Sequence, residues 1–255
     1  MGGTPQQYSF SGHETFPFRY PWLKKGFDAV GEDGDVFLRE DAITTLGVGK
    51  NMVRSIRHWC LAAGVLQENR EGKGGALKGT DFGTLLLADG GLDPYLEDPA
   101  TLWVLHWQIA SNRSRATTWF WAFSHFHEPE FTRDSLAAAL LKWTQALGRK
   151  QVAASSVKRD VDCFLRTYVA SRQSTGEIAE DSLDCPLVEL NLIAPSSDGQ
   201  TYQFLRGGRE ELSDAVLLFA VVRFWDTFAP GSEALALHDV ARQPGSPGRY
   251  CAAPR

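Results

Sequence analysis

The sequence predicts a mainly α-helical fold with short β-hairpins, in which two winged-helix-like modules are joined by an aromatic-rich helical core. Three observations lead to this fold class. The order helix, turn, helix, hairpin occurs in residues 36–80 and again in residues 132–205. The stretch between them is dense in tryptophan and phenylalanine, which suits a buried connector. Basic residues concentrate in the same two stretches. We therefore expect three parts, at residues 1–90, 91–130 and 131–255.

The chain is expected to begin with a loose segment followed by a packed aromatic one. Residues 1–9 are rich in Gly, Gln, Thr and Pro, a composition typical of a poorly ordered terminus. Residues 10–22 then carry five aromatic side chains, too many for a free tail. Pro17 and Pro21 interrupt any early helix, so the first helix is predicted at Trp22–Val30, ending at Gly31.

The first module is predicted in residues 36–80. A short strand starts at Val36, and a helix over residues 40–46 is stopped by Gly47. A second helix runs from Lys50 to Ala63 and stops at Gly64. A wing hairpin follows, with strands over residues 65–68 and 77–80.

The second helix of this module has two distinct faces. Its apolar residues recur on one side of a 3.6-residue period: Met52, Ile56, Trp59 or Cys60, and Ala63. The other side carries amide and guanidinium groups that can bind base edges and phosphates in a major groove. The DNA-contacting residues predicted on the helix are Lys50, Asn51, Arg54, Arg57 and His58, with Ser55 on the same side. Those predicted on the wing are Arg70, Lys73 and Lys78. The alternative is a packed helix pair with a solvated face.

Three further helices are predicted over residues 81–89, 99–111 and 117–127. The last two hold seven Trp and Phe side chains. A hydrophobic spine between the modules is the favoured interpretation, ahead of a base-stacking platform. A protein-docking surface would leave Trp119 or Trp121 exposed. His106, His125 and His127 are interpreted as helix-end and core residues rather than metal ligands.

The second module repeats the order of the first. Thr132 caps a helix that ends at Gly148, and Ser155 and Ser156 cap the next one, over residues 157–171. Strands are predicted over residues 186–193 and 201–205, joined by a turn. The DNA-contacting residues predicted here are Lys150, Lys158 and Arg159. Two helices close the chain: one over residues 214–229, apolar almost all round and therefore a core helix, and a short one over residues 233–242.

Charge and cysteine content narrow the function further. The net charge is −5, but residues 47–80 carry +4 and residues 142–172 carry +5, which leaves −14 for the rest. Two basic stretches in an otherwise acidic chain indicate a nucleic-acid partner, although the net charge of the whole chain is negative. The four cysteines are widely spaced, without a CxxC, so neither zinc nor a disulfide framework is indicated. The sequence shows neither a signal peptide nor a membrane-spanning run, which predicts a soluble, cytoplasmic protein without membrane contact.

One cluster of residues suggests chemistry. His13 and Glu14 are neighbours, and Arg19 and Lys24 follow within the same aromatic stretch. A histidine, a carboxylate and cations form an inventory for metal-assisted or general-base phosphodiester cleavage. Spacing alone favours the alternative, surface polar residues beside a core, because adjacent side chains point in different directions.

The strings SFSGHETFPFRYPWLKKGFDAV and VFLREDAITTLGVGKNMVRSIRHWCLAAGVL resemble the bacterial family of the SspB proteins, which accompanies DNA phosphorothioation genes in anti-phage systems. The resemblance runs from Phe10 to Gly248 and includes CPLVEL at residues 185–190 and LALHDVARQPGSPG at residues 235–248. Family members continue past the PGSPG turn with another ordered segment, whereas this chain ends in RYCAAPR. We therefore expect that a C-terminal element is missing or replaced.

The resemblance implies a function and partners. It implies a protein that nicks DNA so that sulfur can be inserted, working with a cysteine desulfurase, an ATPase and a sulfurtransferase of the PAPS-reductase type. In that reading Glu14 binds Mg²⁺ or Mn²⁺ or acts as a base, His13 is a base or ligand, and Arg19 with Lys24 steadies the scissile phosphate. The other hypothesis is a non-catalytic DNA-binding protein, either a specificity subunit or a repressor of a defence operon. Whether the chain forms a homodimer stays open.

Overall fold

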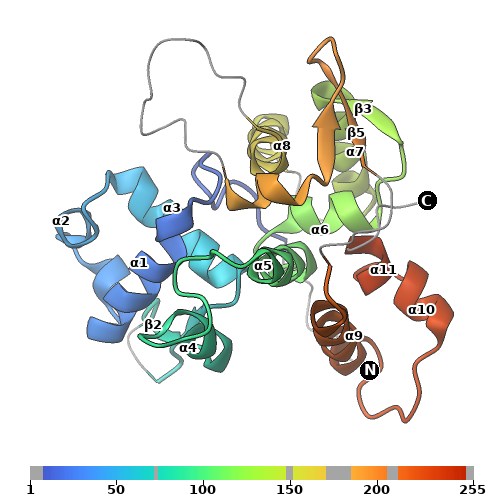
Figure 1. The fold of residues 1–255 in the computed structure, drawn as a ribbon. Helices are drawn as coiled ribbons and strands as arrows, with labels where there is room; N and C mark the ends of the chain where they lie inside the picture. The colour runs from blue at the N-terminus through green and yellow to red at the C-terminus, as the bar shows by residue number, and fades with distance from the viewer. Residues whose placement is uncertain (1–7, 72–73, 148–151, 171–184, 206–211, 251–255) are drawn as a thin grey trace.

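The computed structural model describes residues 8–71, 74–147, 152–170, 185–205 and 212–250, and it is mainly helical with two small antiparallel sheets (Figure 1). The helices are α1 (Tyr20–Glu32), α2 (Ala42–Leu46), α3 (Lys50–Ala62), α4 (Asp81–Leu87), α5 (Pro99–Ser111), α6 (Thr117–Ser124), α7 (Arg133–Ala146), α8 (Ala154–Tyr168), α9 (Asp214–Phe228), α10 (Leu237–Arg242) and α11 (Pro247–Tyr250). The 3₁₀ helices are η1 (Val36–Leu38) and η3 (Pro186–Leu190). The strands are β1 (Leu66–Glu68), β2 (Leu77–Gly79), β3 (Glu130–Thr132), β4 (Ile193–Pro195) and β5 (Thr201–Phe204).

The first unit comprises α1 to α4 and the hairpin β1–β2, and it lies on the left of Figure 1. Gly47 ends α2 in the left-handed conformation, with φ of 63°, a region that glycine enters without steric cost. The hairpin is antiparallel and pairs Gln67 with Lys78. The strand predicted at Val36 is wrong, because that residue begins the 3₁₀ helix η1. Next to it, Leu77 N–H donates to Gly34 O at 2.9 Å, so β2 still hydrogen-bonds to this segment.

Helices α5 and α6 form the middle of the molecule and carry its aromatic core. Trp103, Trp107, Trp119 and Trp121 are each at most 3% exposed. The rings therefore pack as a spine, and neither a base-stacking platform nor a docking surface built on exposed Trp119 or Trp121 exists in this structure. The main core is a continuous cluster of buried side chains reaching from Phe18 to Tyr250, and a small second cluster is formed by Ala42, Leu46 and Val53.

The second unit comprises β3, α7, α8, η3 and the hairpin β4–β5. Thr132 caps α7 as predicted, in a reciprocal capping box with Ser135. Strand β3, which the sequence analysis did not predict, pairs with β5, so the sheet has the order β3-β5-β4. Two predictions are wrong here. Ser155 and Ser156 lie inside the first turn of α8 instead of capping it, and residues 186–190 form a 3₁₀ helix instead of a strand. The reason for the second is Asn191, whose left-handed φ of 48° breaks an extended run.

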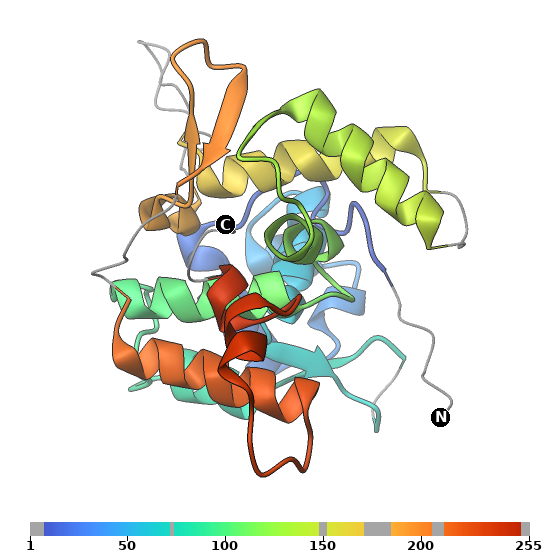
Figure 2. The same cartoon turned by 90° about the vertical axis from the view of Figure 1, so that its right-hand side faces the viewer.

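Helix α9 packs against α5 and α11, and Figure 2 shows it running alongside α5. It is not the core helix that its composition predicts. Only Val216, Ala220 and Phe224, one stripe at i, i+4 and i+8, are buried, while Leu218 is 62% exposed and Val222 is 48% exposed. Among the described helices, none is both long enough and apolar enough to span a bilayer.

Candidate nucleic-acid interface

The SGHETF loop, Ser11–Phe16, is the segment around which the candidate interface is built. Two consecutive turns fold it, closed by Glu14 N–H to Ser11 O at 3.2 Å and by Phe16 N–H to His13 O at 2.9 Å. Ser11, Glu14 and Thr15 have φ of 60°, 48° and 71°. Non-glycine residues in this region carry a steric cost, so the surrounding contacts must hold the loop in place.

His13 supplies the main contact that holds the loop, and it points inward. Its ring accepts a hydrogen bond from Thr15 N–H at Nδ1 (3.0 Å), which leaves the proton on Nε2, and Nε2 lies 3.1 Å from Oδ1 of Asp160 on α8. Asp160 also accepts from Ser11 N–H at 2.5 Å and from the Thr118 hydroxyl at 2.9 Å. Both His13 and Asp160 are 1% exposed. Both ring nitrogens of His13 are therefore occupied by protein partners.

His58 of α3 is buried beneath the SGHETF loop. A Cβ added at Gly12 would lie 2.5 Å from His58 Nδ1, so the loop backbone touches the imidazole. Burial lowers the pKa of His58 to about 3, and the positive charges of Arg115 and Arg57 act in the same direction. The prediction that His58 and Ser55 line an outward face is wrong, because α3 is covered on this side by the loop. Ser55 is fully buried as well.

The exposed face of α3 is consequently narrower than predicted. Lys50, Asn51 and Arg54 are exposed. Arg54 Nη1 lies 3.4 Å from Glu14 Oε1 of the loop. Arg57 is half-buried, and its Nη2 donates to Gly75 O at 3.4 Å.

The wing and α8 supply the remaining cations. On the wing, Arg70 and Lys78 are exposed. On α8, Lys158 pairs with Asp134 of α7 at 3.4 Å, and Arg159 lies near Ser156 Oγ at 3.4 Å. Arg166, also exposed, donates from Nη2 to Thr15 O of the loop. Lys73 and Lys150 lie outside the described residues.

Arg54 from α3 and Arg166 from α8 thus contact the same loop. We call the exposed and half-buried residues at this junction the α3–loop–α8 surface: Lys50, Asn51, Arg54 and Arg166 are exposed, and Glu14 and Thr15 are half-buried. Its cations outnumber its one carboxylate, and it joins segments that are more than 100 positions apart in the chain.

The four residues predicted to be catalytic do not share partners. Arg19 lies over the Trp22 ring at 5.2 Å, and Lys24 pairs with Asp28 at 2.7 Å and Asp89 at 3.2 Å. No hydrogen bond or ion pair between described residues links two of the four, His13, Glu14, Arg19 and Lys24. Sequence and structure therefore place them in one segment but not in one constellation.

A divalent cation does not fit the predicted ligands in this arrangement. His13 has no free nitrogen, and Glu14 faces the cation Arg54. Within the described ranges, no three His, Cys, Asp or Glu side chains are placed to hold one ion. Mg²⁺ needs oxygen ligands that converge, which neither residue provides here.

Asp160 is the important residue that the sequence analysis missed. It was counted only as one charge of a basic stretch. A signal was present, because Val157, Val161 and Phe164 form the apolar stripe of α8 and position 160 falls on that stripe. A carboxylate there must be paired.

The fold and this interface define a class: mainly helical proteins with two small antiparallel sheets, in which an N-terminal loop joins two helix–hairpin units. Residues 10–252 match the model of the family described as "Protein of unknown function (DUF4007)", so the chain belongs to that family. It is also similar to the crystal structure of SspB, at 31% identity and a TM-score of 0.85, and to magnesium ion-bound SspB, at 32% and 0.86. Each similarity covers 95% of this chain and 73% of the other. The chain is thus an SspB-like protein, as its sequence motifs indicated. No curated protein matches it.

Proposed function

We propose that the α3–loop–α8 surface binds duplex DNA and that the protein is the DNA-binding component of a bacterial DNA phosphorothioation system. The observation that carries the proposal is the contact of Arg54 and Arg166 with two adjacent residues of the SGHETF loop, Glu14 and Thr15. Through this loop α3 and α8, both with exposed cations, are held in a fixed relative position. A rigid duplex could contact both helices at once only if their relative position is fixed.

The proposal treats both units as winged helices, with α3 and α8 as recognition helices. In the second unit a helix, α6, precedes β3, α7, α8 and the hairpin, and β5 lies between β3 and β4. In the first unit α1, α2, α3 and β1–β2 follow the same order, with the Gly34–Leu77 hydrogen bond in place of a third strand. In helix-turn-helix proteins the second helix of the pair lies in the major groove. This places Asn51 and Arg54 near base edges and Lys50, Arg70 and Lys78 near phosphates.

The system and the partners come from the SspB-like family. The cysteine desulfurase, the ATPase and the PAPS-reductase-like sulfurtransferase are the partners we propose on that ground. A cytoplasmic location follows from the substrate, because chromosomal DNA of bacteria lies there.

Duplex binding as a function of salt tests the proposal. We expect the affinity for a labelled duplex to fall steeply with salt, because Lys and Arg displace counterions from phosphates. Arg54→Glu should weaken binding by about tenfold or more. The control is Arg242→Glu, an exposed arginine of α10 with the same change in charge. Equal affinity of the two variants and the unchanged protein would contradict the proposal.

DNA nicking is the second candidate function, and the magnesium ion-bound SspB structure favours it. An assay in which the protein is incubated with supercoiled plasmid and Mg²⁺ or Mn²⁺ tests whether it nicks DNA. Open circle that is formed by the protein and lost in Glu14→Gln supports a nickase that uses Glu14. Glu14→Gln keeps the shape of the side chain, whereas His13→Ala would remove the buried contact to Asp160. Plasmid left unchanged beside normal duplex binding supports a specificity subunit or a repressor.

A further inference from the structure

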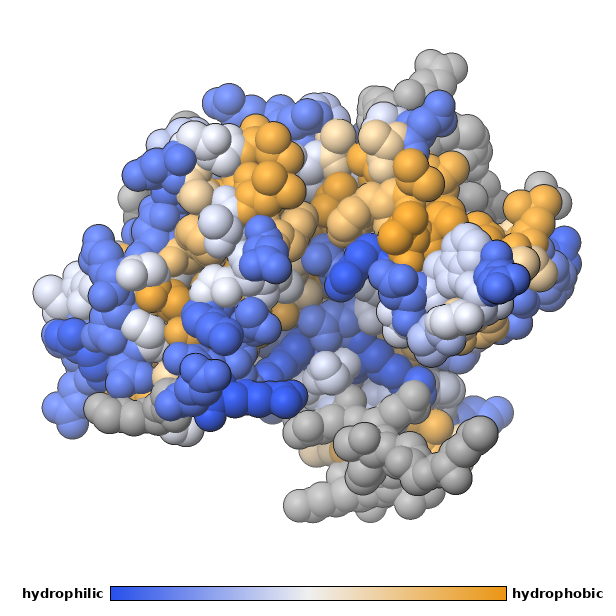
Figure 3. All heavy atoms as spheres, turned by 90° about the horizontal axis from the view of Figure 1, so that it is seen from below, coloured by the Kyte–Doolittle hydropathy of each residue, from blue (hydrophilic) through white to orange (hydrophobic). Residues whose placement is uncertain are grey.

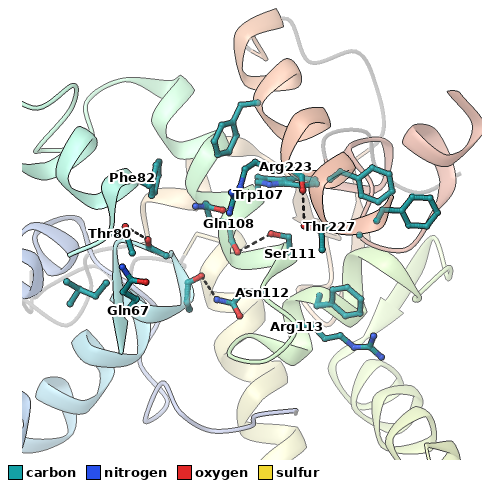
Figure 4. Close-up of a pocket in the computed structure, with 18 of the residues that line it drawn as sticks. Gln67, Thr80, Phe82, Trp107, Gln108, Ser111, Asn112, Arg113, Arg223 and Thr227 are labelled. Carbon is teal, nitrogen blue, oxygen red and sulfur yellow. Dashed lines mark hydrogen bonds between the residues drawn. The ribbon is translucent and has the colours of Figure 1, made fainter. Parts of the chain in front are cut away.

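A groove of about 880 Å³ lies between the first unit and α9, away from the SGHETF loop. Figure 4 shows its construction: Gln67 and Thr80 come from the first unit, Arg223 and Thr227 come from α9, and Gln108 lies between them on α5. In the view from below, hydrophobic residues gather over both sides of the molecule, with hydrophilic residues between them (Figure 3). The proposed function makes no use of this groove.

Two arginines of the described chain line the groove: Arg113, which contacts Tyr8, and Arg223 of α9. The Arg223 side chain is exposed and forms no ion pair with any described residue. In Figure 4 it extends from α9 toward Gln108, whose side-chain amide likewise has no hydrogen-bond partner among the described residues. A guanidinium and an amide without protein partners are available to a phosphate and to a base edge. Asp81 is the single carboxylate among the described lining residues.

Aromatic rings line the groove, and two of them stack on each other. Phe82 of α4 and Phe219 of α9 have ring centroids 6.4 Å apart and planes inclined by 28°, and both side chains are half-buried. Phe228, the last residue of α9, is 44% exposed and also lines the groove. Partly exposed rings beside a free guanidinium are the combination with which proteins bind unpaired bases and their backbone.

The groove is continuous with the wing of the first unit. Gln67 lines it, and in the β1–β2 hairpin Gln67 pairs with Lys78, the exposed cation that we place near DNA phosphates. A strand that leaves a duplex at the wing therefore meets the mouth of the groove.

We infer that this groove binds a single-stranded segment of nucleic acid, with Phe82 and Phe219 as stacking surfaces and Arg223 on the backbone. The inference rests on the proposed function for the origin of the strand. An apolar peptide is the less favoured occupant, because the groove lining includes Gln67, Thr80, Gln108 and Arg223 along its length.

Fluorescence anisotropy with two labelled probes tests the inference: an oligothymidine of about 12 nucleotides and a duplex of similar length. Arg223→Glu should weaken oligothymidine binding by about tenfold, and Phe219→Leu, which keeps an apolar side chain but removes the ring, by about fivefold or more. Both should leave duplex affinity within about twofold, whereas Arg54→Glu should do the reverse. Arg242→Glu is the control for charge, and thermal melting shows that each variant is folded.

Unchanged oligothymidine affinity in Arg223→Glu and Phe219→Leu would overturn the inference. So would a loss of oligothymidine binding in Arg54→Glu alone, since the strand would then lie on the duplex surface. Competition by thymidine monophosphate at equal nucleotide concentration would show a mononucleotide pocket and would also overturn it. If the protein binds oligothymidine through Arg223 but binds no duplex, the groove stands and the proposed duplex function fails.

Discussion

Nε2 of His13 lies 3.1 Å from Oδ1 of Asp160, and the two residues are 147 positions apart in the chain. This hydrogen bond joins the SGHETF loop to α8, the second recognition helix of the proposed interface. It explains why a histidine and a glutamate that are neighbours in sequence behave so differently. His13 is used for packing, while Glu14 stays at the surface beside Arg54.

Removing the acceptor should destabilise the protein strongly. Asp160→Ala leaves the His13 ring, the Ser11 amide and the Thr118 hydroxyl without their shared partner in the core. We expect the free energy of unfolding to fall by about 3–5 kcal/mol, measured by urea denaturation. Asp134→Ala is the control: its side chain is 87% exposed, and we expect a loss of about 1 kcal/mol or less. Similar small losses in both would show that the buried hydrogen bonds are not important for stability.

Two glycines of α1 should respond to alanine in opposite directions. A Cβ at Gly26 would lie 2.5 Å from Cys60 Sγ and 2.9 Å from Ile56 Cγ2, because α1 and α3 approach closely there. Gly26→Ala should therefore cost about 1–3 kcal/mol through overpacking. Gly31 has nothing within 4 Å of such a Cβ, so Gly31→Ala should stabilise the helix by up to about 1 kcal/mol. Thermal or urea unfolding gives both values, and a stabilising Gly26→Ala would contradict the close packing.

Stability should decline as the pH falls below neutrality. The pKa of His58 is about 3 in the folded protein, below the ordinary value of 6.5, so the unfolded chain binds the proton first. Well above pH 6.5 the side chain is neutral in both states and causes no pH dependence. Below pH 6.5 the unfolded chain is protonated while the folded one is not, so each pH unit costs roughly 1.4 kcal/mol of stability until the folded pKa is approached. His125, with its pKa lowered to about 4 mainly by burial, adds to the same trend.

His58→Gln isolates the contribution of His58 to this pH dependence. The variant should show a shallower fall in unfolding free energy between about pH 6.5 and 4.5 than the unchanged protein. Nuclear magnetic resonance of the His58 ring is a direct check. A ring signal that titrates near pH 6.5 in the folded state would contradict the prediction.

Arg54 and Arg57 should contribute unequally to duplex binding. Arg54→Ala should weaken it by about 1–3 kcal/mol if the guanidinium binds a base, and by less, with a flatter salt dependence, if it binds only phosphate. Arg57→Ala should have the smaller effect, because Arg57 is half-buried and donates to Gly75 O. Anisotropy titrations at several salt concentrations measure both the loss of affinity and the change in its salt dependence. Unchanged affinity in both variants would remove the first unit from the interface.

The local elements could be predicted from sequence because their signals are local. Gly47 and Thr132 mark the ends of helices through their own backbone and side-chain geometry, and the apolar stripes of α3 and α8 follow from periodicity. The errors arise where tertiary packing decides. His58 is polar and lies on the polar side of α3, yet the SGHETF loop covers it. Helix α9 is apolar all round, yet only one stripe meets the core.

The candidate site was harder to predict than the fold. Glu14, Arg54 and Lys50 could be identified as polar residues of the site from composition and spacing. Asp160 and Arg166 could not be assigned to the same site, because nothing local links α8 to a loop near the N-terminus.

The left-handed turns of the SGHETF loop also set an order of events during synthesis. Residues 11–16 leave the ribosome early, and their anchor on α8 is translated 147 positions after His13, roughly 7 to 30 seconds later at ordinary rates of synthesis. Throughout that interval a nascent chain carries the loop without the buried partner of His13. A ribosome stalled before codon 160 would therefore display an N-terminal half whose loop lacks its anchor, and the surface is completed only once Asp160 and Arg166 of α8 have been synthesised.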